Sequence, residues 1–210
     1  MKHAFWHERW SENRIGFHQS DFNRWLTKYW SSLGLSGEES VFVPLCGKSR
    51  DMLWLREQGH QVTGVELSDL ACRDFFAEQG VDIDAFEDGA FHRRERDGIS
   101  LLAGDVFKAT RAVLNKPRAI YDRAALIALP SEMRIDYAAH IAHLTESGDQ
   151  ILLVGLEYDN ERNEPPFSVK GDEVRRLYSA DFMIEELESA DLNEGRFDNQ
   201  REVVYRLVRK

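Results

Sequence analysis

The sequence is poor in cysteine and in basic charge. Only two cysteines, Cys46 and Cys72, occur among 210 residues, so a disulfide framework is excluded, and no Cys-x-x-Cys or Cys/His cluster has the spacing of a zinc site. Lys and Arg number 27 against 37 Asp and Glu, which gives a formal net charge of −10. Because nucleic acids and anionic membranes bind basic surfaces, this balance argues against both as partners.

Long hydrophobic runs are also lacking. No segment reaches the roughly 20 apolar residues that cross a bilayer, and the N-terminal MKHAFWHERW has no apolar stretch of the kind found in secretory signals. We therefore expect a cytoplasmic protein. Apolar residues make up 42% and charged residues 30%, as in ordinary globular domains. No repeat, low-complexity run or linker divides the chain, so we predict a single domain over residues 1–210.

From residue 40 onward, short apolar segments alternate with segments of helical character. The predicted helices cover 49–58, 68–79, 131–145 (capped by Ser131) and 172–178, and the predicted strands cover 40–45, 61–67, 99–103, 119–121, 150–156, 183–187 and 203–208. This alternation is typical of βαβ units. It predicts an α/β fold whose core, residues 40–210, is a Rossmann-like, mostly parallel, seven-stranded, doubly wound sheet. The last two strands lack a long helix between them and predict an antiparallel C-terminal hairpin.

The first thirty residues are rich in aromatic side chains. Residues 20–30 place theirs at helical spacing and predict a helix. Residues 1–20 show no clean amphipathic period, which makes an ordinary core helix a poor interpretation; they hold Phe5, Trp6, Trp10 and Phe17. We predict that this segment is an aromatic lid, with packing on the edge of the sheet as the alternative.

A polar segment and a pair of histidines are interpreted as structural features rather than as parts of a site. The polar segment 86–99 predicts a hairpin, and its charged residues 92–97 are expected to be solvated, with a place at the mouth of a substrate site as the alternative. His140 and His143 are spaced i, i+3 on a predicted helix, but no third metal ligand lies near them in the sequence. We therefore expect them on a solvated helix face and predict no metal site.

Polar residues follow the predicted parallel strands, where ligands bind in a doubly wound sheet. The first strand runs into the turn Pro44–Ser49, which contains Gly47. The second ends at Glu66, nineteen residues after Gly47, where a carboxylate can accept hydrogen bonds from both hydroxyls of a ribose. Asp105-Val106 follows the third strand, with Asp105 as a possible acceptor for an adenine amino group, and Asp122-Arg123 ends the fourth.

The turn after the first strand limits the choice of nucleoside cofactor. Dinucleotides call for G-x-G-x-x-G, and only Gly47 is present. A phosphate-binding P-loop needs a glycine at position 42, where Phe42 stands. An adenosine cofactor without phosphates fits better, and S-adenosylmethionine is the obvious one. Displacement at its sulfonium needs no covalent enzyme intermediate, so we interpret Cys46 as a packing residue.

Several segments resemble the thiopurine S-methyltransferase family, in its bacterial form. They stand in the family's order and spacing from about Phe5 to Leu207, and they are Phe5-Trp6, Trp10, Gly16–Gln19, Pro44–Ser49, Gly59-His60, Gly64–Ser68, Tyr121–Leu126 and Pro165–Phe167. The resemblance implies a class I methyltransferase fold. It also implies S-adenosyl-L-methionine as methyl donor and S-adenosyl-L-homocysteine as product.

The resemblance also implies roles for individual residues. Cofactor binding falls on Trp10, Leu45, Glu66 and Arg123, with Asp105 and Val106 at the adenine, while Gly47 lets the backbone approach the cofactor. Substrate binding falls on Phe17, Arg123 and Arg196, and catalysis on Arg123 with Asp122.

The implied reaction is methyl transfer to the sulfur of aromatic or heterocyclic thiols, with selenium and tellurium compounds as further acceptors. A general base is not obligatory, because an aromatic thiol is already partly ionised near neutral pH. The alternative is a non-catalytic module that senses S-adenosylmethionine. We expect a monomer whose partner is a small molecule, because no apolar interface can be identified in the sequence.

Overall fold

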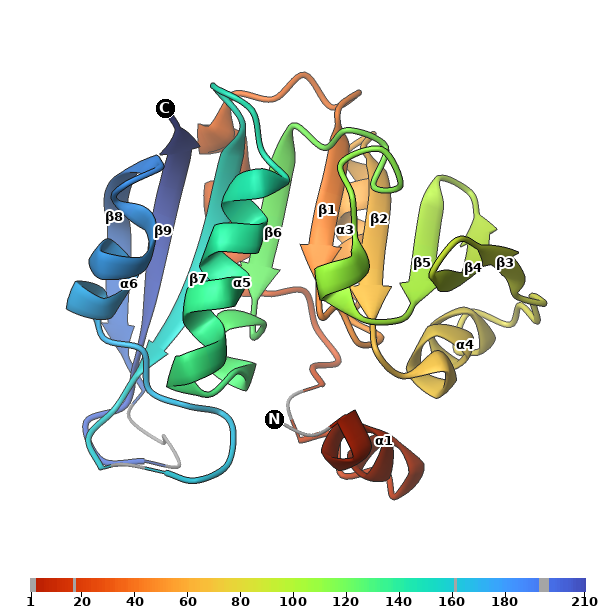
Figure 1. Ribbon diagram of the computed structural model, residues 1–210, viewed down its shortest axis with the longest axis horizontal. Coiled ribbons are helices and arrows are strands. Elements are labelled where there is room, and N and C mark those ends of the chain that lie inside the picture. The colour runs from red at the N-terminus through yellow and green to blue at the C-terminus, as the bar shows by residue number, and fades with distance from the viewer. Residues whose placement is uncertain (1–2, 17, 161, 193–196) are drawn as a thin grey trace. The chain divides into compact units, whose positions relative to one another are not determined.

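The computed structural model describes residues 3–16, 18–160, 162–192 and 197–210. Figure 1 shows the course of the chain. The chain forms two compact units, residues 1–117 and 118–210. None of the helices in the described part of the chain is long and apolar enough to cross a membrane.

Three parallel strands form the centre of the first unit. β1 (Ser40–Pro44) pairs with β2 (Gln61–Glu66), and β2 pairs with β5 (Ile99–Ala103). Nearly every side chain of the three strands is buried, as expected for parallel strands covered on both faces. All three predicted strands are therefore confirmed, and their carboxyl ends meet at one edge of the sheet (Figure 1).

The predicted hairpin extends this sheet. β3 (Phe86–Asp88) pairs with β4 (Phe91–Arg96), and β4 pairs antiparallel with β5. The prediction of seven strands is therefore wrong by two, because the hairpin was not counted as part of the sheet. The expectation of solvated charges fails for Arg94, which is buried and forms an ion pair with Asp69.

Two helices follow the first two strands. α3 (Asp51–Glu57) leads to Gly59, whose φ of +102° turns the chain back toward β2. A Cβ at Gly59 would lie 2.5 Å from the carbonyl oxygen of Gly37, so no larger residue fits there. α4 (Asp69–Ala77) begins after Ser68, which caps the helix because its hydroxyl accepts a hydrogen bond from the amide of Ala71 at 3.4 Å.

The N-terminal segment differs from the prediction. Residues His3–Ser11 form the helix α1, which contacts α4 near the carboxyl ends of β1 and β2 (Figure 1). Only Trp10 of this helix is buried, which explains why the sequence shows no amphipathic period. The helix predicted over 20–30 is present as α2 (Arg24–Tyr29) and the 3₁₀ turn η1 (Trp30–Leu33).

The second unit contains four strands in the order β6-β7-β9-β8. β6 (Ala119–Arg123) and β7 (Gln150–Glu157) are parallel. β9 (Arg201–Arg209) runs antiparallel to β7 and to β8 (Phe182–Asp191), which confirms the C-terminal hairpin. With the hairpin of the first unit, the described residues contain nine strands.

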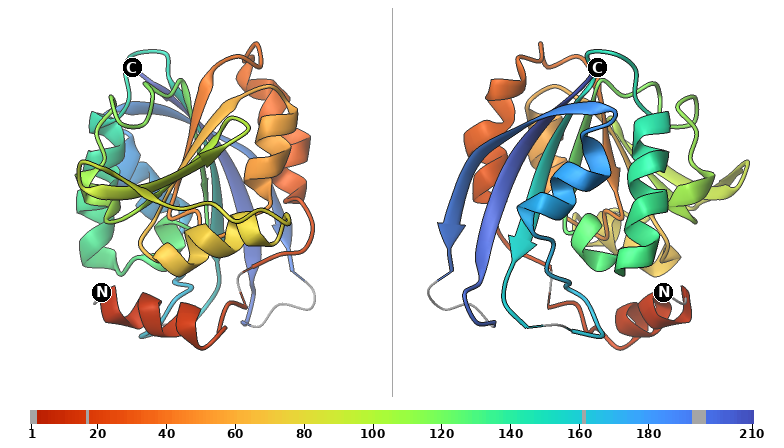
Figure 2. Two further views of the ribbon diagram at one scale, coloured as in Figure 1. Left: turned by 90° about the vertical axis from the view of Figure 1, so that its right-hand side faces the viewer. Right: turned by 60° about the vertical axis from the view of Figure 1, so that its left-hand side comes forward.

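Two helices cover one face of these four strands (Figures 1 and 2). They are α5 (Ser131–His143) and α6 (Gly171–Tyr178), and the short turn η3 (Leu126–Ala128) precedes α5. Ser131 does not cap α5 as predicted. Pro130 occupies the cap position, and the hydroxyl of Ser131 donates to Glu132 instead, at 3.4 Å. A proline fits here because the first amides of a helix have no partner within it.

Candidate functional site

The turn after β1 has an unusual backbone. Leu45 has φ of +46° and Gly47 has φ of +53°. A left-handed conformation costs a residue with a Cβ about 1–2 kcal/mol, so the surrounding structure must hold Leu45 in place. A Cβ at Gly47 would lie 3.1 Å from Cζ2 of Trp10. The indole of Trp10 therefore lies directly over the turn, and a side chain at position 47 would have to push the indole back.

Glu66 ends β2 and is only 7% exposed. Its Oε2 accepts a hydrogen bond from the amide of Gly47 at 3.0 Å, and its Oε1 accepts one from the amide of Ser68 at 2.9 Å. The indole N–H of Trp10, the only donor of that side chain, also bonds to this carboxylate. Burial raises the pKa of Glu66, and these hydrogen bonds oppose the rise.

The carboxylate of Glu66 is therefore nearly saturated by the protein itself. Its two oxygens offer about four acceptor positions, and the amides of Gly47, Leu67 and Ser68 contribute bonds along with Trp10. The three amides belong to segments at the ends of β1 and β2, whereas Trp10 comes from the separate helix α1. A hydroxyl-bearing ligand can reach Glu66 most easily by displacing the indole.

Asp105 and Val106 lie at the same edge. The amide of Gly104 donates to the carbonyl oxygen of Glu66 at 2.8 Å, which places the end of β5 beside the end of β2. Asp105 caps the 3₁₀ turn η2 (Val106–Lys108), because its Oδ1 accepts a hydrogen bond from the amide of Phe107 at 3.0 Å. The structure thus brings together the predicted residues of the first unit, which are Trp10, Leu45, Gly47, Glu66, Asp105 and Val106.

In the second unit, β6 ends in Asp122 and Arg123. The Asp122 side chain is buried: Oδ1 accepts from the amide of Leu126 at 3.2 Å, and Oδ2 accepts from the hydroxyl of Tyr137 at 2.7 Å. Burial raises the pKa of Asp122 to about 6, although its hydrogen bonds act in the opposite direction. Tyr137 was not singled out from the sequence, because nothing in its spacing distinguishes it from the other buried residues of α5.

Arg123 contrasts with its neighbour. It is half-buried, and its guanidinium has no hydrogen bond or ion pair with any described residue. The next residue, Ala124, has φ of +65°, a second strained residue directly after a strand. The guanidinium is therefore available to bind an anion, for which its planar set of donors is well suited.

The segment Pro165–Phe167, which carries part of the resemblance, packs beside the residues that follow Arg123. The amide of Phe167 donates to the carbonyl oxygen of Ile127 at 2.7 Å. Arg134 of α5 holds the same region, because its Nε donates to the carbonyl oxygen of Leu129 at 2.9 Å. Two predicted substrate residues, Phe17 and Arg196, lie outside the described residues.

Other reactive side chains are not arranged for metal binding or nucleophilic catalysis. Among the described residues, no group of three His, Cys, Asp or Glu side chains could hold a metal ion. His140 is half-buried and His143 is exposed. Cys46 and Cys72 are free and buried, and burial raises the pKa of both thiols. Such thiols stay protonated and are poor nucleophiles.

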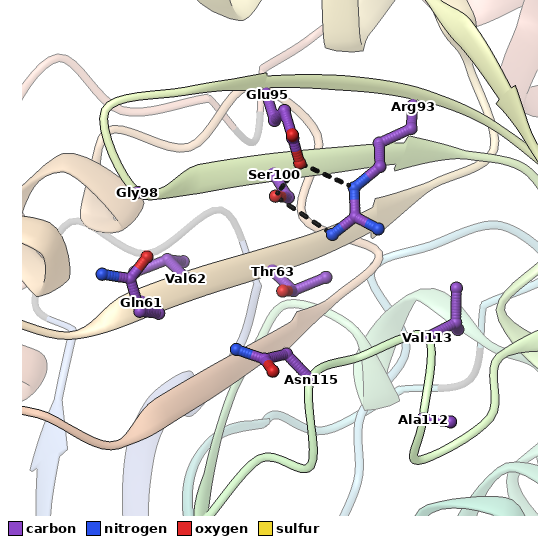
Figure 3. Close-up of a pocket in the computed structure, with 10 residues that line it drawn as sticks. All are labelled: Gln61, Val62, Thr63, Arg93, Glu95, Gly98, Ser100, Ala112, Val113 and Asn115. Carbon is purple, nitrogen blue, oxygen red and sulfur yellow. Dashed lines mark hydrogen bonds and ion pairs between the residues drawn. The ribbon is translucent and has the colours of Figure 1, made fainter.

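A cavity of about 300 Å³ lies on the sheet of the first unit (Figure 3). It is lined by the amino-terminal part of β2 and by Arg93, whose Nε lies 3.1 Å from Oε2 of Glu95 and whose Nη2 donates to Ser100. Thr63, the lining residue of β2 nearest to Glu66, precedes it by three residues, roughly 10 Å along a strand. The cavity is therefore separate from the edge that holds Glu66.

Comparison with known proteins shows the family of the chain. The family model for thiopurine S-methyltransferase matches residues 1–210. The chain belongs to this family. Curated thiopurine S-methyltransferases from Marinobacter nauticus and Azotobacter vinelandii are 41% and 43% identical, each over the full length of both chains. One from Shewanella baltica is 47% identical over 91% of this chain and 88% of its own length.

Solved structures support the same fold. A Burkholderia thailandensis 1,6-didemethyltoxoflavin-N1-methyltransferase with bound S-adenosylhomocysteine matches with a TM-score of 0.67 at 15% identity, over 99% of this chain and 87% of its own. The magnesium protoporphyrin IX methyltransferase of Synechocystis, with bound S-adenosylmethionine, matches with a TM-score of 0.66 at 12% identity, over 99% and 97%. The chain is thus an S-adenosylmethionine-dependent methyltransferase of the thiopurine S-methyltransferase family.

Proposed function

We propose that this methyltransferase transfers the methyl group to the sulfur of small aromatic or heterocyclic thiols such as thiopurines. The family supports this choice of acceptor. The observation that carries it in the structure is the half-buried guanidinium of Arg123, which no described residue neutralises. An anionic thiolate is the form of the acceptor that reacts, and a positioned arginine favours that form.

The residues around Glu66 fit the cofactor. The buried carboxylate at the end of β2 suits ribose hydroxyls. The turn Leu45–Gly47 carries no side chain at Gly47, so a cofactor that displaces the Trp10 indole can approach the backbone there. Asp105 and Val106 then serve the adenine, with Asp105 as acceptor for its amino group. When bound, S-adenosylmethionine supplies an electrophilic methyl group on a sulfonium, so the protein has no need of a metal or a covalent intermediate.

Trp10 is proposed to change partners when the cofactor binds. Its indole bonds to Glu66 and covers Gly47, so a ribose hydroxyl that reaches Glu66 takes the place of the indole N–H. The aromatic face then remains available to a sulfonium through cation–π attraction. The helix α1 acts as a lid in this proposal, excluding water that would otherwise solvate the thiolate.

Arg123 is proposed to bind an anion, either the thiolate or the methionine carboxylate. These two roles differ in their kinetics. Loss of a thiolate contact lowers kcat and raises KM for the thiol, whereas loss of a carboxylate contact raises the dissociation constant of the cofactor. Phe17 and Arg196 are proposed to contact the acceptor, and selenium and tellurium compounds are proposed as further acceptors because their anions are equally soft nucleophiles. We expect the protein to act as a monomer.

Incubation with methyl-labelled S-adenosylmethionine and 6-mercaptopurine tests the proposal. We expect label in the methylthio product, which mass spectrometry identifies as S-methylated rather than N-methylated. Thiophenol, benzeneselenol, tellurite and the purine lacking sulfur compare acceptor classes in parallel. Cofactor binding measured by calorimetry, together with no transfer to any of these acceptors, would contradict the proposal and favour a sensor of S-adenosylmethionine.

A further inference from the structure

Asp122 accepts hydrogen bonds from one side chain and two backbone amides. Its Oδ2 accepts the hydroxyl of Tyr137, from α5, at 2.7 Å, and both side chains are about 1% exposed or less. Its Oδ1 accepts the amide of Leu126 at 3.2 Å, and the amide of Ala125 also bonds to the carboxylate. One buried carboxylate thus joins a helix to the two amides that follow Ala124.

The chain turns sharply between these amides and Arg123. Ala124 adopts φ of +65°, a conformation that costs a residue with a Cβ about 1–2 kcal/mol unless its surroundings hold it. Successive side chains of a strand point to opposite faces, so Arg123 leaves β6 on the face opposite to Asp122. The bonds to Ala125 and Leu126 therefore stabilise the turn that sets the direction of Arg123, without any contact between the carboxylate and the guanidinium.

We propose that Tyr137 is a positioning residue for Arg123. Its hydroxyl orients the Asp122 carboxylate, and the carboxylate holds the turn Ala124–Leu126 in the shape that directs the guanidinium toward its anion. The inference rests on the role proposed above for Arg123 and adds two residues to it. Asp122 acts here on the backbone and does not itself receive a proton from the thiol.

The ionisation of the neighbouring groups agrees with this arrangement. Tyr137 of α5 and Tyr178 of α6 face Asp122, and burial raises the pKa of both phenols, so both stay neutral near pH 7. Arg134 of α5, the nearby cation on that helix, is instead engaged by Leu129 and Glu173. Burial raises the pKa of Asp122 to about 6, so at neutral pH its carboxylate is ionised and accepts all three donors.

Two tyrosines offer a matched pair of substitutions. Tyr137→Phe removes the hydroxyl that bonds to Asp122. Tyr178→Phe makes the same chemical change at an equally buried position near Asp122, with no hydrogen bond from Tyr178 to the carboxylate. Both variants keep the aromatic ring and lose one buried hydroxyl. Any difference between them therefore reports the hydrogen bond from Tyr137 to Asp122.

The test measures kcat for the thiopurine between pH 5 and 8.5 in the wild type and both variants. We expect Tyr137→Phe to lower kcat about tenfold at pH 7, the scale of one lost hydrogen bond to a charged group. The pH of half-maximal kcat on the acid side should rise by about one unit, because the ionised carboxylate has lost a donor. Tyr178→Phe should keep kcat within about twofold and leave the acid limb in place.

A second measurement does not need turnover. Amide hydrogen exchange, resolved by NMR at Ala125 and Leu126, should be faster in Tyr137→Phe than in Tyr178→Phe. Asp122→Asn should likewise speed exchange at these amides and should abolish the acid limb. An inactive wild type would contradict the thiol methyltransferase activity and leave the exchange result to decide whether Tyr137 holds the turn. Equal kinetics and equal exchange in the two phenylalanine variants would overturn the role of Tyr137.

Discussion

Two buried carboxylates, Glu66 and Asp122, end strands in different units and are built alike. Each accepts hydrogen bonds from backbone amides of the turn beside it, each lies near a residue with positive φ, and each bonds to one aromatic side chain from a helix. The helices differ. Trp10 lies on α1, where it is the only buried residue, whereas Tyr137 lies on α5 among several buried neighbours.

Because of this difference, we expect Trp10 to be an exchangeable partner of Glu66 and Tyr137 to be a permanent partner of Asp122. Little buried surface holds α1, so the bond from Trp10 to Glu66 can open at a small cost in free energy and admit a ligand. Tyr137 is fully buried in a helix of thirteen residues, so we expect its bond to Asp122 to stay closed in the folded protein. The first carboxylate is thus suited to bind a cofactor, and the second is suited to hold a turn.

The largest effect is expected from loss of the lid. Deletion of residues 1–18 should lower methyl transfer about 100-fold and leave a folded protein, because the deletion removes α1 and Trp10 while all the strands remain. Urea unfolding followed by circular dichroism checks the fold. Within α1, Trp10→Ala should reproduce most of the loss, and Trp6→Ala, at a half-buried position in the same helix, should not. Equal losses in the two variants would show that the helix matters only for stability.

Glu66→Ala is expected to have the next largest effect. Loss of a ribose contact with a charged acceptor should cost about 1.5–3 kcal/mol, or about 10- to 100-fold in the dissociation constant of S-adenosylhomocysteine measured by calorimetry. Glu95→Gln removes a charge at an exposed position of the same unit and serves as the control. Wild-type affinity in Glu66→Ala would remove Glu66 from the ribose role.

Arg123 should show a smaller but more specific defect. Arg123→Lys keeps the charge and loses the planar set of donors, so we expect kcat to fall about tenfold, with Arg123→Ala lower still. Arg118→Lys changes an arginine next to the opposite end of β6, where it pairs with Asp149, and should leave kcat unchanged. Full activity of Arg123→Lys would mean that only a positive charge is needed.

For Asp122 we expect, beside the kinetic effects given above, a change in how stability depends on pH. In the folded protein the carboxyl group of Asp122 keeps its proton up to about pH 6, whereas in the unfolded chain it loses the proton near pH 3.8. Between these values the folded state binds more protons, so this group lowers the free energy of unfolding as the pH rises. In Asp122→Asn this fall should be absent, as urea midpoints at pH 4.5, 5.5 and 7 would reveal. If the free energy of unfolding fell equally with pH in the wild type and in Asp122→Asn, the raised pKa of Asp122 would be contradicted.

The neighbours of Glu66 follow from the sequence more directly than the partner of Asp122 does. Glu66, Gly47 and Asp105 could be found because residues at the ends of parallel strands meet at one edge, whatever the details of packing. The helical state of residues 3–11 could not be found, because α1 buries one side chain and leaves no periodic pattern. Tyr137 was also missed, since its partner Asp122 lies fifteen residues away and only packing of α5 on β6 joins them.

Hydrogen exchange in the free protein and in the complex with S-adenosylhomocysteine tests the distinction between the two carboxylates most directly. We expect the amides of residues 3–11 and of the turn Leu45–Gly47 to gain protection on binding. We expect the amides of Ala125 and Leu126 to be protected equally in both states. Equal protection of residues 3–11 with and without ligand would contradict the exchangeable role of Trp10, and protection of Ala125 and Leu126 only in the complex would contradict the permanent role of Tyr137.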